Sequence, residues 1–205
     1  MKISYAICVC DEVRELDTLL HFLKKVKNKH DEIVVLVDSS KKVAEIPMLL
    51  NRHKIERVFL REFKNDFAEH KNYLNRKCKG DYIFNLDADE VPTEELIRHI
   101  NSRLPITKPD LVYVPRINMC LGQTEEFLKR WNFKANDLGW INWPDFQGRV
   151  FKNDKDIYWQ SIVHEKIGGP GCKNIEGCEA SPKLSLIHVK TVQKQNKQNE
   201  FYATF

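Results

Sequence analysis

The chain has 205 residues, of which 42% are hydrophobic and 30% are charged. This length and composition are typical of one globular domain with a substantial core, and they exclude a disordered or fibrous protein. The net charge of +4 is mild and the lysines are scattered, so we expect no nucleic-acid partner. No segment has the ~18 apolar residues of a membrane-spanning helix. The N-terminus lacks the features of a signal peptide, so we expect a cytoplasmic protein without a transmembrane segment.

Strand and helix patterns alternate through the first hundred residues. Apolar runs predict strands at residues 3–10, 32–38, 56–60 and 81–86, and helical spacing predicts helices at 13–28, about 43–52 and about 66–78. The second strand is a nearly continuous apolar run, as in a strand buried on both faces of a parallel sheet. The series predicts an α/β fold with a Rossmann-like, mostly parallel sheet flanked by helices.

The pattern changes after residue 104. Strands are expected at residues 111–117, 148–152 and 157–163, with loops between them, and a helix begins near Thr191. We interpret residues 1–205 as one domain with a nucleotide-binding half, 1–104, and a smaller mixed half that binds the second substrate, 105–205. The last helix reaches Phe205 without a glycine or proline stop signal, which is consistent with a domain cut from a longer protein.

The six cysteines form no Cys-x-x-Cys pair, so a zinc site has little support. Cys8 and Cys10 are two residues apart on a predicted strand and are interpreted as core residues. Cys172 and Cys178 are close enough in sequence to bridge a loop. In a cytoplasmic setting we favour free thiols over a disulfide for this pair.

Acidic residues follow three of the predicted strands, at Asp11 and Glu12, at Asp38, and at Asp87 and Asp89. Ligands of parallel sheets bind beyond the carboxyl ends of the strands, where these side chains are expected to meet. No glycine precedes Gly80, so neither a P-loop nor a Gly-x-Gly-x-x-Gly turn can cradle phosphates there.

Carboxylates at a strand end are natural ligands of Mg²⁺ or Mn²⁺, which also bridge to phosphate oxygens. We therefore interpret Asp87 and Asp89 as a metal site. Each acid also has a structural interpretation: Asp38, followed by two serines, could form a turn, and Asp87–Asp89 could form a polar loop before a helix capped by Thr93.

Residues 66–96, DFAEHKNYLNRKCKGDYIFNLDADEVPTEEL, resemble the signature region of family 2 glycosyltransferases of the GT-A fold, particularly the lipopolysaccharide-core type. There the pattern is Phe-Ala-Glu-x-Arg-Asn, a helix, Gly-Asp, an apolar strand and Asp-Ala-Asp-Glu. Further similar motifs occur in the expected order: ISYAICVCDEVREL, EIVVLVDSS, WPDFQGRVF, VHE and LIHVK. Asp11 replaces the family's Asn, and Lys71 replaces its Arg.

The resemblance implies roles for individual residues. The nucleotide-sugar donor would be bound by a set from the first half: Asp11, Glu12, Asp38, Lys71 and Asp87. Mn²⁺ or Mg²⁺ would be held by Asp87, Asp89 and His188. The catalytic base would be Asp145, with Glu165 as the alternative.

All four tryptophans fall between residues 131 and 159. Because aromatic rings cover the apolar faces of sugars, we interpret this cluster as part of an acceptor site, with a small second core as the alternative. The acceptor residues expected on this basis and from the resemblance are Trp140, Trp143, Arg149 and His164.

Taken with the resemblance, the residues predict a metal-dependent, inverting glycosyltransferase that moves a sugar from a nucleotide-sugar, with UDP favoured, to a glycan or glycoconjugate. One alternative is a haloacid-dehalogenase-type phosphatase, whose strand and Asp-x-Asp pattern also fits residues 82–91. That motif normally opens its domain, whereas here three strand units precede it. Another alternative is a non-catalytic module that binds a nucleotide-sugar. Turnover of a nucleotide-sugar would distinguish the enzyme from this module.

Overall fold

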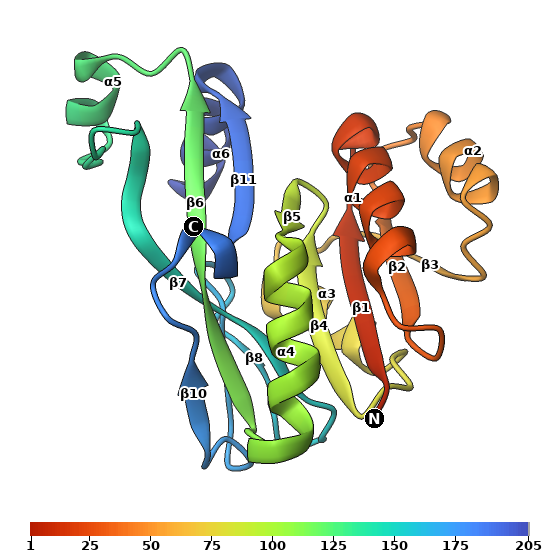
Figure 1. The fold of residues 1–205 in the computed structure, drawn as a ribbon. Helices are drawn as coiled ribbons and strands as arrows, with labels where there is room; N and C mark the ends of the chain where they lie inside the picture. The colour runs from red at the N-terminus through yellow and green to blue at the C-terminus, as the bar shows by residue number, and fades with distance from the viewer. Residues whose placement is uncertain (205) are drawn as a thin grey trace.

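The structure, a computed structural model, describes residues 1–204. Its centre is a nine-stranded mixed sheet with the order β3-β2-β1-β4-β7-β6-β11-β5, and β10 pairs with β6 (Figure 1). Two short strands form a separate sheet: β8 (Tyr158–Gln160) and β9 (Lys166–Gly168). The strands of the main sheet are β1 (Ile3–Val9), β2 (Glu32–Asp38), β3 (Arg57–Arg61), β4 (Tyr82–Asp87), β5 (Glu90–Pro92), β6 (Leu111–Leu121), β7 (Trp140–Lys152), β10 (Ile175–Gly177) and β11 (Leu186–Thr191).

The first half of the chain builds four parallel neighbouring strands of the sheet. Strands β3, β2, β1 and β4 are parallel neighbours. Their residues alternate between the two faces, because successive side chains of a strand point in opposite directions. Ile3, Tyr5 and Ile7 join one core cluster, while Ala6 and Val34 join the other. The predicted α/β fold with a mostly parallel sheet flanked by helices is confirmed.

Helices cover both faces of this sheet. α1 (Val13–Val26), α2 (Glu45–Arg52) and α4 (Glu94–Thr107) contribute to the first core cluster, and α3 (Phe67–Asn75) contributes to the second. In Figure 1, α1 and α4 lie in front of the sheet, and α3 and α6 (Val192–Tyr202) lie behind it. α5 (Glu125–Arg130) lies beside a small third cluster. The predicted N-cap of α4 is confirmed, since Thr93 accepts a hydrogen bond from Leu96 N.

The second half differs in detail from the sequence-based expectation. The predicted strand at 148–152 is only the end of β7, which runs antiparallel between β4 and β6. The strand predicted at 157–163 shrinks to β8, because Ser161 and His164 adopt positive φ and turn the chain. α6 ends at Tyr202, and Phe205 lies outside the described residues.

All six cysteines are free, so the free thiols predicted for Cys172 and Cys178 are confirmed. Within residues 1–204, no helix combines the length and the hydropathy required to cross a membrane.

Candidate active site

The carboxyl ends of the parallel strands meet at one edge of the sheet. Cys8 lies beside Asp87 in the register of β1 and β4, and Val9 lies beside Val37 in that of β1 and β2. Next to this edge is a cavity of about 370 Å³, lined by residues of β4, β6, β7, the loop after β8, β11 and α6. Its polar lining includes six residues predicted from the sequence: Asp87, Asp145, Arg149, His164, Glu165 and His188.

A chain of ion pairs crosses the wall of this cavity. It begins at Glu165, whose Oε1 lies 2.8 Å from Lys71 Nζ, and Lys71 Nζ is 3.0 Å from Asp87 Oδ1. Lys71 is 5% exposed, and its Nζ also lies 4.6 Å from the centre of the Trp159 ring. Burial of Lys71 opposes its charge, but Asp87 and Glu165 outweigh this effect and raise its pKa. The predicted donor-binding lysine is therefore a buried cation between two candidate functional carboxylates.

The same chain continues from Asp87 through two arginines. Arg149 lies 2.8 Å from Asp87 and 2.6 Å from Glu90, and Arg116 lies 2.7 Å from both Glu90 and Asp145. Glu90 is fully buried. Burial opposes ionisation of Asp87, but Arg149 and Lys71 outweigh it and hold the pKa of this carboxyl well below its ordinary value. Glu90 is thus a buried link between the first and second halves of the chain.

Asp145 is held by several donors. Its Oδ2 accepts hydrogen bonds from Arg116 at 2.7 and 2.9 Å and from Asn118 Nδ2 at 2.8 Å, and Oδ1 accepts one from Gln147 Nε2 at 2.7 Å. Burial would raise the pKa of Asp145, but Arg116 and Asn118 outweigh it and lower that pKa. A carboxylate with a lowered pKa is a weaker base.

Two of the three predicted metal ligands come together. His188 Nε2 lies 3.6 Å from Asp89 Oδ1, and His188 Nδ1 donates to Asn118 Oδ1 at 2.8 Å. Burial lowers the pKa of His188, although the facing Asp89 opposes this effect. Asn118 also donates to Asp145, which fixes its amide orientation and therefore the histidine tautomer. An oxygen and an imidazole nitrogen side by side fit a divalent cation, whereas Asp87 is engaged by Lys71 and Arg149.

Two lysines that the sequence reasoning missed lie beside Asp89. The Nζ atoms of Lys190 and Lys194 are each 3.4 Å from Asp89 Oδ2. Burial of Asp89 is outweighed by His188 and Lys190, so its pKa is lowered. Their position in the sequence was the available signal, because Lys190 is two residues from His188 in the motif LIHVK and shares its face of β11. Arg116 and Asn118 likewise share one face of an otherwise apolar strand.

Besides Lys71, three predicted donor residues lie outside the cavity lining. Asp38 is 7% exposed and accepts hydrogen bonds from Ser40 N, Ser40 Oγ, Phe63 N and Cys10 Sγ, as in a turn. Glu12 accepts from the backbone N–H groups of Cys10 and Asp11. Asp11 pairs with Lys41 at 2.7 Å on the surface. Their donor-binding roles stay predictions, and a nucleoside would have to replace some of these contacts.

The predicted acceptor aromatics also lie beside the cavity rather than on its wall. Trp140 and Trp143 contact each other with ring centres 5.2 Å apart, and neither belongs to the lining. Trp159 does line the cavity, is 4% exposed, and has a buried Nε1 without a hydrogen-bond partner. His164 lines it too, with its ring 5.5 Å from that of Tyr202 in α6.

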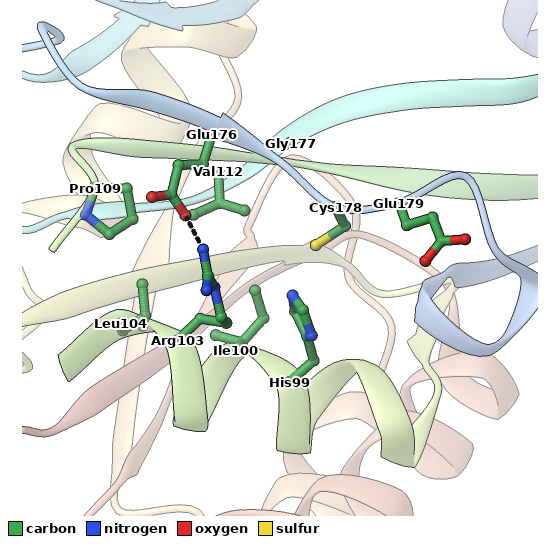
Figure 2. A pocket seen from close by; sticks show the side chains of 10 residues that line it. All are labelled: His99, Ile100, Arg103, Leu104, Pro109, Val112, Glu176, Gly177, Cys178 and Glu179. Carbon is green, nitrogen blue, oxygen red and sulfur yellow. Dashed lines mark ion pairs between the residues drawn. The ribbon is translucent and has the colours of Figure 1, made fainter. Parts of the chain in front are cut away.

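Two other features of the described residues lie apart from this site. A cavity of about 170 Å³ lies between α4 and β10, with Arg103 paired to Glu176 at 3.8 Å (Figure 2). Burial raises the pKa of its Cys178 to about 11, so that thiol is no nucleophile.

The second feature is a group of possible metal ligands. The ligand atoms of Asp17, His21 and His53 lie within 4.8 Å of one another, but Arg52 pairs with Oδ1 of Asp17 at 3.1 Å.

Residues 4–171 match the family described as Glycosyl transferase family 2. The solved structure of S. aureus TarS 1–349 aligns with a TM-score of 0.61 at 15% identity, covering 92% of this chain and 60% of that chain. Its complex with UDP-GlcNAc gives 0.62 at 14% identity, over 93% and 59% of the two chains. Its complex with UDP gives 0.63 at 14% identity, over 92% and 60%. No curated protein matches the chain.

The chain belongs to glycosyl transferase family 2, because the match covers well over half of its residues. This confirms the predicted family and the enzyme class that it defines, and it argues against the phosphatase alternative. The likeness to TarS concerns the fold and agrees with the predicted GT-A architecture. The chain spans about 60% of the length of the TarS 1–349 chains that it matches.

Proposed function

We propose that the chain is a metal-dependent, inverting glycosyltransferase that moves a sugar from a UDP-sugar to a hydroxyl group of a glycan or glycoconjugate. The proposal is carried by the cavity beyond β4, where the candidate bases Asp145 and Glu165 and the candidate metal ligand His188 form part of the wall, and Asp89 lies beside His188. Family membership supports glycosyl transfer. The UDP and UDP-GlcNAc complexes of TarS support a uridine nucleotide. The lipopolysaccharide-core subtype and a cytoplasmic location stay predictions.

In the proposed reaction, the acceptor oxygen bonds to the anomeric carbon while the bond from that carbon to the diphosphate breaks. The bonding electrons leave with the diphosphate, and attack from the opposite face inverts the configuration. A Mn²⁺ or Mg²⁺ ion held by Asp89 and His188 would offset the charge that develops on the leaving group. A carboxylate of the cavity wall takes the proton of the acceptor hydroxyl.

The contacts in the ligand-free chain favour Glu165 over Asp145 as this base. Asp145 was the first choice from sequence, but two side chains besides Arg116 donate to it, and its pKa is lowered. Glu165 lines the cavity and pairs with Lys71, which it shares with Asp87. A donor bound at Asp87 would draw Lys71 toward its phosphates and free Glu165 to accept a proton.

The direct test is turnover with a panel of UDP-, GDP-, dTDP- and CMP-sugars and simple glycan acceptors. We expect release of UDP from a UDP-sugar in the presence of Mn²⁺ or Mg²⁺, and none when EDTA removes the ion. Asp154→Ala, in an exposed turn, is the matched control and should keep full turnover. If the chain binds a nucleotide but turns over no combination of donor and acceptor, the result would instead support the non-catalytic module.

A further inference from the structure

Lys190 and Lys194 occupy the place beside Asp89 that a cation would need. Both Nζ atoms contact Oδ2 of Asp89 at 3.4 Å, and the side chain of Asp89 is only 8% exposed. Its other oxygen, Oδ1, faces His188. In the structure, the carboxylate proposed to hold the metal is therefore neutralised by two ammonium groups.

Carboxylates and cations face each other around the cavity. Five carboxylates each contact at least one of five cations, and Lys194 also contacts Glu12 and Glu15. A divalent cation alone would add two positive charges beside two ammonium groups, at a cost that is large in a buried setting. The two negative charges of a nucleotide-sugar diphosphate, bound together with the ion, offset the two positive charges that the ion adds. The carboxylates are Asp87, Asp89, Glu90, Asp145 and Glu165, and the cations are Lys71, Arg116, Arg149, Lys190 and Lys194.

We propose that Lys190 and Lys194 exchange partners when the enzyme is loaded: they hold Asp89 in the ligand-free chain and bind the donor diphosphate once the cation occupies Asp89. This inference rests on the proposed function, since it requires a nucleoside diphosphate and a metal at this site. It makes the ion and the nucleotide bind as a pair. By linkage, each then raises the affinity of the other by the same factor.

The two lysines have the surroundings that such an exchange needs. Lys194 also lies 3.3 Å from Glu15 and 3.9 Å from Glu12, so it keeps ionic partners when it leaves Asp89. Lys190 donates to Gln198 Oε1 at 2.6 Å and lines the cavity. A lysine presents a compact charge on a flexible stem, so rotation of the side chain moves the charge without moving β11 or α6.

The test measures binding of Mn²⁺ and UDP to the full chain, separately and together, by calorimetry. In the wild type, we expect UDP to raise Mn²⁺ affinity at least about tenfold, within the ordinary range of coupling between sites. Lys194→Gln should bind Mn²⁺ alone several-fold more tightly, because a repulsive charge is gone. The same variant should bind UDP with Mn²⁺ about tenfold more weakly, the change expected for one lost charge-assisted contact.

Lys197→Gln is the matched control, because Lys197 is exposed on the same helix and should leave both affinities unchanged. If Lys194 has only a structural role, Lys194→Gln should weaken both Mn²⁺ binding and UDP binding. A loss of both affinities, or no change in either affinity, therefore overturns the proposed exchange of partners. Lys194 is 35% exposed in its side chain, so the variant should fold, and Lys190→Gln provides a second measurement. A wild-type chain that binds neither Mn²⁺ nor UDP in any combination would overturn the proposed function itself.

Discussion

Asp145 and Glu165 stand at opposite ends of one chain of ion pairs, and their roles can be separated by single substitutions. Asp145 accepts four hydrogen bonds, three of them on Oδ2. Glu165 shares the ammonium of Lys71 with Asp87. The two carboxylates therefore differ in how many donors already engage their oxygens.

We predict that Glu165→Gln lowers kcat by about 10²–10⁴-fold, the usual contribution of a positioned base, while UDP binding stays near normal. Glutamine keeps the size of the side chain and removes its basicity. Asp145→Asn should lower turnover less, although it leaves Arg116 with Glu90 as its carboxylate partner. Steady-state kinetics and UDP titrations on both variants provide the measurement. If Asp145→Asn lowers turnover more than Glu165→Gln does, Asp145 is the base, as first predicted from the sequence.

Several site residues were recognisable in the sequence because a motif or strand end marked them. Asp87, Asp89, Glu165 and His188 belong to short patterns that lie in the expected order, and all four meet at the cavity or beside it. Glu90 stood in the same motif, but its function as a buried link depends on two arginines from distant strands. No local pattern indicates such partners.

At the scale of elements, two of the N-capping threonines, Thr93 and Thr191, provide a matched comparison. Thr93 caps α4, which buries Leu96, Ile97, Ile100 and Leu104, whereas Thr191 caps α6, which has no buried residue. We predict that Thr93→Ala lowers the free energy of unfolding by about 1 kcal/mol. Thr191→Ala should change it much less and instead loosen α6.

Urea unfolding of the two variants measures the first effect, and amide hydrogen exchange in α6 measures the second. Because α6 carries Lys194, loosening it should also weaken nucleotide binding. Equal losses of global stability in both variants would show that α6 belongs to the cooperative core, against this prediction.

The strands of the first half were predicted closely because each is an apolar run between polar turns. β2 was predicted to the residue, and β3 was displaced by only one. β7 was mostly missed: its first eight residues mix polar and aromatic side chains and include Pro144, and its pairing with β6 and β4 stabilises it as a strand. β5 contains an acid and a proline, and its sheet partner β11 lies far along the chain. Long-range pairing of this kind leaves no local periodicity.

At the scale of the whole molecule, bound ligands should stabilise the fold. With UDP and Mn²⁺ a hundredfold above Kd, linkage gives about 2.7 kcal/mol of stabilisation, or roughly a 5–10 °C rise in Tm for a domain of this size. Asp89→Ala should remove most of this rise, because it removes the carboxylate proposed to hold the ion.

Thermal unfolding with UDP plus Mn²⁺, and with UDP plus EDTA, provides the measurement. Asp154→Ala serves as the control and should show the full rise. If EDTA leaves the UDP-induced rise unchanged in the wild type, the proposed metal bridge is wrong. If Asp89→Ala lowers Tm strongly without ligand while Asp154→Ala does not, Asp89 supports the fold rather than the ion.

The position of β11 has a consequence for how the protein is made. This strand lies between β6 and β5, and in its register His188 is paired with Glu90, next to Asp89. The parallel strands β1 to β4 can assemble as soon as the ribosome releases them, because domains begin to fold during synthesis. β5 and its acidic loop have no sheet partner until residues 186–191 emerge. We therefore expect nascent chains stalled at Ser185 to show protected amides in β1 and β2 but no UDP binding, so the ligand site forms only after β11 has emerged from the ribosome.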